Sequence, residues 1–175
     1  WDVDEIVVMD IDASITGQEP NVELVEWAAK VCFVPLVVGG GIKTIGHIQR
    51  LLKAGADKIC INSIVRDEIS FVTEASNMFG DQCITVSVDV VKEKGEYSVF
   101  DYREPKSFGS DLSKHLKEIE QAGAGEILLN SVDRDGSREG YDLELLKRVS
   151  SLVKIPVIAL GGVGRFEHLA DAVLV

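Results

Sequence analysis

Basic residues and cysteines are scarce in this sequence of 175 residues. Lys and Arg together number 18 against 29 Asp and Glu, which gives a formal net charge of −11. A chain this acidic repels phosphate backbones and anionic lipids, so we expect neither nucleic-acid nor membrane-surface binding. The three cysteines, Cys32, Cys60 and Cys83, are an odd number without metal-ligand spacing. They predict buried, reduced thiols in a cytoplasmic protein.

Long apolar runs are also missing. No run approaches the ~20 residues of a membrane span, and no basic-then-apolar leader opens the chain. The three histidines fall in helical patterns, at helix positions on the surface or behind a site, and predict no metal site. Neither glycine cluster fits the G-x-G-x-x-G pattern, which argues against a dinucleotide cofactor. We therefore expect no cofactor.

Short apolar runs alternate with helical patterns along the chain. The runs are nearly continuous in Val, Ile and Leu, as in strands covered on both faces, and they lie at 5–11, 35–41, 58–62, 83–91, 126–131 and 156–162. This alternation predicts parallel βαβ units in one α/β domain. The exception is 92–102, whose turn and polar-alternating strand predict a small hairpin or flap.

An internal repeat refines the predicted fold. A shift of 121 residues aligns 5–48 with 126–169 without a gap, and nine of the 44 positions are identical. The identities keep Pro35, Gly40 and Gly41 in register with Pro156, Gly161 and Gly162, which we interpret as duplication. Each period contains four strand-helix units, so the doubled structure is a twofold-duplicated (β/α)8 TIM barrel. Six units are present, and we expect residues 1–175 to form a single, incomplete barrel domain that lacks its first and last units.

The glycine clusters follow predicted strands and open predicted helices. Backbone N–H groups freed by glycine at a helix N-terminus bind phosphate. Tight strand-helix turns are the alternative explanation of each cluster. Two clusters in one register favour two phosphate sites at a barrel mouth, and Asn62 and Ser63 at the next strand end can complete the first.

Two sets of charged residues stand at strand ends. Asp89 lies in the otherwise apolar run 83–91, where a carboxylate at the active face of a barrel is a candidate general acid or base. Aspartates that follow other strands, such as Asp12 and Asp133, can instead cap loops and helices. Glu5, Lys58 and Glu126 begin alternate strands. They predict either salt bridges at the barrel base or a polar ring around an axial pore.

Several segments together resemble the cyclase subunit of imidazole glycerol phosphate synthase, the HisF family. They are VVGGGI, KICINS, ITVSVD, GAGEILLNSVDRDGSREGYD and PVIALGGVG, and the resemblance covers the whole chain. It implies a duplicated (β/α)8 barrel that takes ammonia from a glutaminase partner docked at its amino face. The implied reaction is a lyase-type cyclisation in histidine biosynthesis. It converts a bis-phosphorylated ribulosyl aminoimidazole carboxamide intermediate into imidazole glycerol phosphate and aminoimidazole carboxamide ribotide.

The resemblance also implies roles for individual residues. Asp89 matches the catalytic aspartate of strand five, while its strand-one partner lies outside this chain, so the chain alone is expected to be inactive. One phosphate site is matched by Gly40, Gly41, Asn62 and Ser63, and the other by Asp135, Gly136, Gly161 and Gly162. Three members of a charged ammonia gate are matched by Glu5, Lys58 and Glu126. Asp57 resembles a residue of the glutaminase interface.

Four departures from the family pattern lie near the predicted active mouth. Asp12 replaces the threonine of D-I-T-A-S, Asn130 replaces another threonine, and Val90-Val91 stand where a lysine is usual. The flap, which is usually glycine-rich before its T-G, reads REPKSFG at 103–109. These changes resemble paralogues that pass ammonia to an amidotransferase acting on a nucleotide-linked sugar for surface polysaccharide. Both a histidine-pathway cyclase and such an ammonia conduit are therefore compatible with the sequence.

Overall fold

The computed structural model describes residues 3–103 and 106–175. The chain divides into two compact units. One comprises Trp1–Val86 with Ala122–Gly125, and the other Ser87–Gln121 with Glu126–Val175. Strand β4 (Ile84–Glu93) begins in the first unit and continues in the second.

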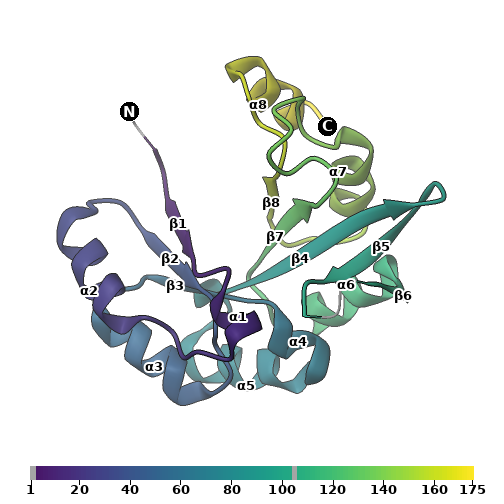
Figure 1. Cartoon of the computed structure of the whole chain (residues 1–175). Helices are drawn as coiled ribbons and strands as arrows, with labels where there is room; N and C mark the ends of the chain where they lie inside the picture. Colours follow the sequence, from purple (N-terminus) through teal and green to yellow (C-terminus); the bar gives the residue numbers. More distant parts are fainter. Residues whose placement is uncertain (1–2, 104–105) are drawn as a thin grey trace. The chain divides into compact units, whose positions relative to one another are not determined.

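The first unit is a parallel sheet with helices along it (Figure 1). Its strands are β1 (Ile6–Met9), β2 (Leu36–Gly39), β3 (Lys58–Ile61) and the start of β4. Its helices are α1 (Ala13–Thr16), α2 (Val22–Val31), α3 (Ile45–Ala54), α4 (Ser63–Asp67), α5 (Ser70–Phe79) and the 3-10 turn η1 (Asp81–Cys83). Strands β2 and β3 and the start of β4 are buried because helices cover them, whereas β1 is half-buried with Val7 exposed. Leu36, Ile48 and Ile59 are central to this core.

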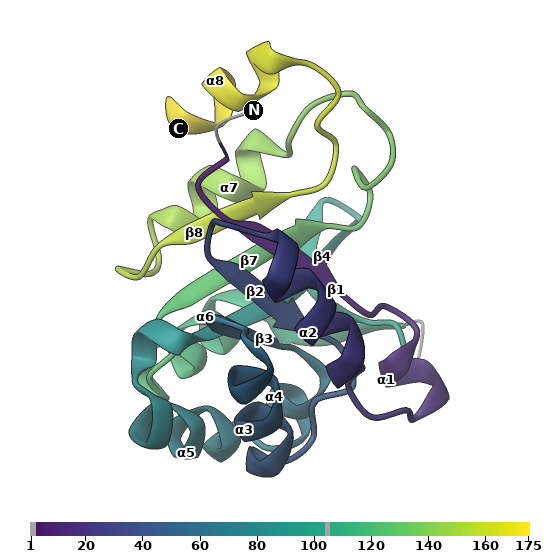
Figure 2. The same cartoon turned by 90° about the vertical axis from the view of Figure 1, so that its left-hand side faces the viewer.

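The second unit combines parallel strands with an antiparallel hairpin. Strand β7 (Glu126–Ser131) pairs with β4 and with β8 (Val157–Leu160), while β4 continues into the antiparallel strands β5 (Glu96–Asp101) and β6 (Lys106–Asp111). The helices are α6 (Leu112–Gln121), α7 (Leu143–Ser150) and α8 (Phe166–Val173) (Figure 2). Leu116, Ile127 and Val149 are fully buried in this core.

The internal repeat has a matching structure in each unit. Ile6 pairs with Leu36 between β1 and β2, and the equivalent residues Ile127 and Val157 pair between β7 and β8. Each ladder comprises four residue pairs, and the two ladders have the same register. Since a register slip would move side chains to the opposite face, this agreement supports a duplication of the βαβ unit.

The α/β prediction is confirmed. Six parallel strands in the described residues follow the order β1-β2-β3-β4-β7-β8, which is the strand order of part of a (β/α)8 barrel. The hairpin predicted at 92–102 is present, with its turn at Lys94 and Gly95. Helices α1 and α4 were not predicted, because four or five residues are too short to show helical periodicity. No helix among the described residues is long and apolar enough to cross a membrane.

One expectation about buried residues needs correction. Cys60 is buried as predicted, but Cys32 and Cys83 are only half-buried. The departure from the family pattern at 103–109 includes residues 104–105, which lie outside the described residues.

Candidate active site

A buried carboxylate–amide pair lies on neighbouring strands of the second unit. Asn130 on β7 donates through Nδ2 to Oδ1 of Asp89 on β4 at 2.8 Å, and the two residues are only 6% and 4% exposed. An ionised carboxylate can only accept hydrogen bonds, so this contact assigns the NH2 side of the amide. The carboxylate is thereby held in one orientation, as proton transfer requires.

Asp89 does not lie at the very end of its strand. Strand β4 continues for four residues beyond Asp89, because Val90–Glu93 pair with β5 of the hairpin. The contact with Asn130 was not predicted. The only signal in the sequence was that Asn130 departs from the threonine of the family pattern.

The pKa of Tyr102, which follows β5, depends on Asp89, Asn130 and a further carboxylate, Asp135. Burial raises the pKa of its phenol, and the negative charges of Asp89 and Asp135 raise this pKa further, while a side-chain hydrogen bond with Asn130 lowers it. The sequence did not single out Tyr102. The second unit therefore gathers two carboxylates, an amide and a neutral phenol from three different chain segments.

The first predicted phosphate site lies at the ends of the paired strands β2 and β3. Gly40 and Gly41 follow β2 with φ angles of 107° and 67°. A Cβ at Gly40 would overlap the backbone of Asp10, and one at Gly41 would lie 2.5 Å from the carbonyl oxygen of Gln18. Asn62 and Ser63 directly follow β3. Close backbone packing thus requires glycine at both positions, in agreement with a tight turn between strand and helix. The same turn lies beside the end of β3.

The second predicted phosphate site is built in the same way. Gly161 and Gly162 follow β8 with φ angles of 95° and 91°. A Cβ at Gly161 would lie 2.8 Å from the carbonyl oxygen of Ser131 and 3.5 Å from the backbone nitrogen of Asp135. The structure therefore brings Gly161 beside Asp135. Gly136 lies in an open turn, where a Cβ would meet no atom within 4 Å.

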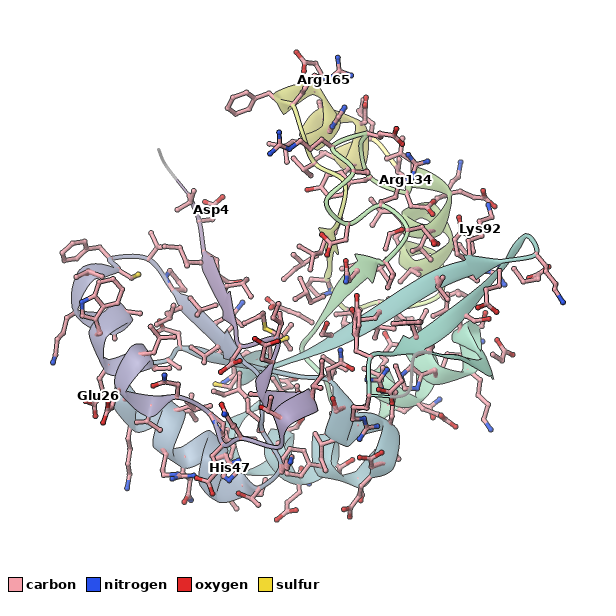
Figure 3. The ribbon with its side chains drawn as sticks, in the orientation of Figure 1. Asp4, Glu26, His47, Lys92, Arg134 and Arg165 are labelled. Carbon is pink, nitrogen blue, oxygen red and sulfur yellow. The ribbon has the colours of Figure 1, made fainter. Side chains whose placement is uncertain are left out.

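Two equivalent histidines support the turns that follow these glycines. Nδ1 of His47 accepts the backbone N–H of Lys43 at 3.3 Å, and Nδ1 of His168 accepts that of Gly164 at 3.2 Å. Both imidazoles are buried, and Figure 3 labels His47, which lies in α3. Each imidazole therefore has a hydrogen-bonding role in holding a turn.

Of the candidate gate residues, Lys58 and Glu126 begin strands β3 and β7, and Glu5 directly precedes β1. Nζ of Lys58 lies 2.8 Å from Oε2 of Glu5, and the side chains are 23% and 21% exposed. This pair spans the first and third strands of the first unit, with β2 between them. Glu126 begins β7 in the second unit and is half-buried. Charged side chains at these positions are expected both for salt bridges at the barrel base and for a polar ring around an axial pore.

Asp57, the residue matched to a glutaminase interface, has a local structural contact. Its carboxylate accepts the backbone N–H of Leu36 at 2.8 Å, and its own N–H donates to the carbonyl oxygen of Leu36 at 2.8 Å. Asp57 is nevertheless exposed. It therefore fixes the start of β2 while remaining accessible at the amino end of the strands.

Near its turn, the hairpin is joined to helix α7 within the second unit. The Tyr97 hydroxyl donates to Asp142 at 2.9 Å, and Nζ of Lys92 lies 2.7 Å from Glu144 and 4.9 Å from the centroid of the Tyr97 ring (Figure 3 labels Lys92). Burial, followed by the contact with Asp142, raises the pKa of Tyr97 to about 12. Beside this junction, a cavity of about 620 Å³ is lined by residues that include Lys92, Asp133 and Arg134.

Comparisons with known proteins agree with the geometry. A family model described as "Histidine biosynthesis protein" matches residues 1–174. The "Putative imidazole glycerol phosphate synthase subunit hisF2" of Vibrio vulnificus (strain YJ016) is 61% identical over 174 residues, which are 99% of this chain and 64% of that protein. The "Imidazole glycerol phosphate synthase subunit HisF" of Sulfurisphaera tokodaii is 46% identical over 172 residues, 98% of this chain and 69% of that protein. The chain thus spans about two thirds of the length of these curated relatives.

Proposed function

We propose a function on the premise that this chain belongs to the HisF family of histidine biosynthesis proteins. In this proposal, the whole protein that contains the chain is a cytoplasmic, ammonia-using cyclase. It converts the bis-phosphorylated ribulosyl aminoimidazole carboxamide intermediate into imidazole glycerol phosphate and aminoimidazole carboxamide ribotide. The observation that carries the proposal is the buried Asp89 carboxylate, held by Asn130 on the neighbouring strand. We further propose that residues 1–175 belong to one barrel domain, completed by units outside this chain.

Asp89 is assigned the role of general acid or base. A carboxylate held in one orientation can shuttle a proton to or from a bound substrate, which typically accelerates a reaction ~10²–10⁴-fold. Its proposed partner is an aspartate on the first strand of the barrel, outside this chain. The chain alone is therefore expected to give no turnover.

The two glycine turns are assigned to the two phosphates of the substrate. Gly40, Gly41, Asn62 and Ser63 would hold one phosphate, and Asp135, Gly136, Gly161 and Gly162 would surround the other. Helices α3 and α8, which follow the glycine turns, are long enough for their N-terminal dipoles to favour an anion. The carboxylate of Asp135 would contact a hydroxyl or N–H group rather than a phosphate, since like charges repel.

Ammonia is proposed to reach the barrel from a glutaminase partner at the amino face. The partly exposed pair Glu5–Lys58, together with Glu126, would border its path, and Asp57 would contact the partner. The partial exposure of the pair favours a hydrated boundary over a sealed ion cluster.

A second candidate function is an ammonia conduit for an amidotransferase that modifies a nucleotide-linked sugar. The departures at Asp12, Asn130 and Val90-Val91 favour it. The two candidates share the fold and the ammonia path, and differ in the protein that uses the ammonia and in whether the barrel performs chemistry of its own.

The test uses the whole protein with ammonium chloride and the bis-phosphorylated intermediate, and chromatography to follow both products. Stoichiometric formation of imidazole glycerol phosphate and the ribotide supports the cyclase. Absence of both products overturns it. Ammonia transfer to a nucleotide-sugar acceptor in the presence of its amidotransferase would then support the conduit.

A further inference from the structure

Tyr102 lies at the candidate active site but has no role in the proposed function. It follows β5, and its side chain is 45% exposed, whereas Asp89 and Asn130 are buried. A ligand that approaches the buried pair can therefore contact the Tyr102 phenol directly.

The pairing of β4 with β5 places Tyr102 on the side of the hairpin that carries Asp89. Val90 pairs with Val99 between the two strands. Asp89 and Phe100 are the next residues along each strand, and they share the opposite face because side chains alternate along a strand. The Tyr102 ring packs edge-on against the Phe100 ring, with 4.9 Å between the ring centroids and 83° between the ring planes. The strand register and this ring contact together hold the phenol near the Asp89 carboxylate.

A salt bridge fixes the turn that carries Tyr102. The carboxylate of Asp101, which is buried, accepts the backbone N–H of Arg103 at 2.9 Å and lies 2.8 Å from Nη2 of its guanidinium. The residues on both sides of Tyr102 are thus tied to each other. A turn fixed in advance loses less conformational entropy when its side chain contacts a ligand.

The phenol has one hydrogen-bonding function left to use. Its hydrogen bond with Asn130 lowers its pKa, so the amide donates this bond and the phenol oxygen accepts it. Burial and the charges of Asp89 and Asp135 raise the pKa, so the phenol keeps its proton. Among the described residues, the phenol O–H makes no further hydrogen bond. The two carboxylates only accept hydrogen bonds, and the amide of Asn130 donates to Asp89 and to Tyr102. Of these four side chains, Tyr102 is therefore the one that offers a ligand a hydrogen-bond donor.

We propose that Tyr102 is a substrate-contacting residue whose phenol O–H donates a hydrogen bond to a neutral oxygen, a hydroxyl or a carbonyl, on the carbon chain of the ribulosyl group. This inference rests on the proposed function, because that function supplies the substrate. There, the reacting part of the substrate lies at Asp89, and one phosphate lies near Asp135 and Gly161. Tyr102 is close to both carboxylates, so its phenol meets the hydroxylated chain that joins the reacting part to this phosphate.

The direct test is a calorimetric titration of the whole protein with the bis-phosphorylated intermediate, without ammonium so that no turnover follows. Tyr102→Phe removes the O–H and keeps the ring. We expect it to raise the Kd about tenfold, as for the loss of one hydrogen bond. Tyr141→Phe makes the same change at a half-buried tyrosine of the same unit and should leave the Kd unchanged. An unchanged Kd in a folded Tyr102→Phe protein would overturn the proposal.

An NMR titration of the unmodified whole protein provides a second arm that does not depend on whether a variant folds. The label is ¹³C at the ring carbon that bears the hydroxyl of each tyrosine. We expect the intermediate to shift the Tyr102 signal and leave the Tyr141 signal in place. Inorganic phosphate is the control ligand and should shift neither. No shift of Tyr102 with the intermediate, or an equal shift with phosphate alone, would contradict a contact with the carbon chain.

The titrations without ammonium separate this inference from the proposed function. Binding that depends on Tyr102, with no products after ammonium is added, would support the contact and reject the cyclase. Normal product formation with an unchanged Kd and no shift of the Tyr102 signal would reject the contact and leave the cyclase standing. An unmodified protein that does not bind the intermediate would overturn both.

Discussion

Individual polar side chains in this protein often make two contacts at once. Oδ1 of Asp142 accepts the N–H of Leu145 at the start of α7 and also the hydroxyl of Tyr97 from the hairpin. Asn130 has the same potential at the candidate active site. An oxygen shared in this way links the N-terminal cap of a helix to a strand far away in the sequence, so removing one hydrogen-bond partner affects both the helix and the strand.

Tyr97 provides a test of this coupling through pH. Its folded-state pKa of about 12 lies above the ordinary value of 10.0. Above pH 10, the unfolded chain loses the phenolic proton before the folded protein does, so the stability that Tyr97 contributes is present below pH 10 and is lost as the pH rises toward 12.

We expect Tyr97→Phe to reduce the free energy of unfolding by about 1 kcal/mol at pH 7, because one hydrogen bond is lost. Phenylalanine does not titrate, so the difference between the two proteins should shrink between pH 10 and pH 12. Urea unfolding of both proteins at pH 7, 9 and 11 measures this difference. A difference that does not change with pH would contradict the assignment.

Lys58 tests whether the charged pair at the amino end is a gate. Since Lys58 and Glu5 are partly exposed, Lys58→Met should cost no more than about 1 kcal/mol of stability. In the complex with a glutaminase partner, it should lower glutamine-dependent product formation more than ammonium-dependent formation, because dissolved ammonia enters at the opposite end.

Lys53→Met, on the exposed end of α3, serves as the control and should affect neither assay. Equal losses in both assays together with a large drop in melting temperature would show that the pair is structural.

At the level of elements, the repeated unit is a strand followed by a glycine turn, with a buried histidine in the next helix. Asn21 and Asp142 cap α2 and α7 at equivalent positions, and His47 and His168 hold equivalent turns. The glycines permit the chain to pass close to the backbone of the preceding βα segment, as the approach of Gly41 to Gln18 illustrates. The turns are thus shaped by packing before any phosphate is bound.

A matched pair of glycines separates packing from backbone conformation. Gly17 and Gly41 have similar φ angles of 74° and 67°, but only a Cβ at Gly41 meets a backbone oxygen. Gly17→Ala should cost ~1–2 kcal/mol for the left-handed conformation. Gly41→Ala should cost a further ~1–3 kcal/mol for overpacking. Denaturant unfolding measures both, and equal costs would refute the packing explanation.

For the whole molecule, the apolar runs and the repeat predicted the α/β class and the parallel strand order, and the turn and polar alternation at 92–102 predicted the hairpin. The duplication was visible because Pro35, Gly40 and His47 each recur after 121 residues. The contact between Asp89 and Asn130 was not predictable in this way. It joins residues 41 positions apart and depends on β7 pairing with β4 across the intervening hairpin. Gly40 and Gly161 are needed because they approach the backbone of Asp10 and Ser131, residues far away in the sequence, and such approaches leave no local sequence pattern.

The central claim is that Asp89 performs the proton transfer of an ammonia-dependent cyclisation. The most direct test is the ammonium-dependent turnover number of the whole protein carrying Asp89→Asn, with Asp171→Asn on the exposed side of α8 as the matched control. We predict a ~10²–10⁴-fold loss for Asp89→Asn with an unchanged circular dichroism spectrum, and no loss for the control. A folded Asp89→Asn protein that retains most of the turnover number would contradict the account.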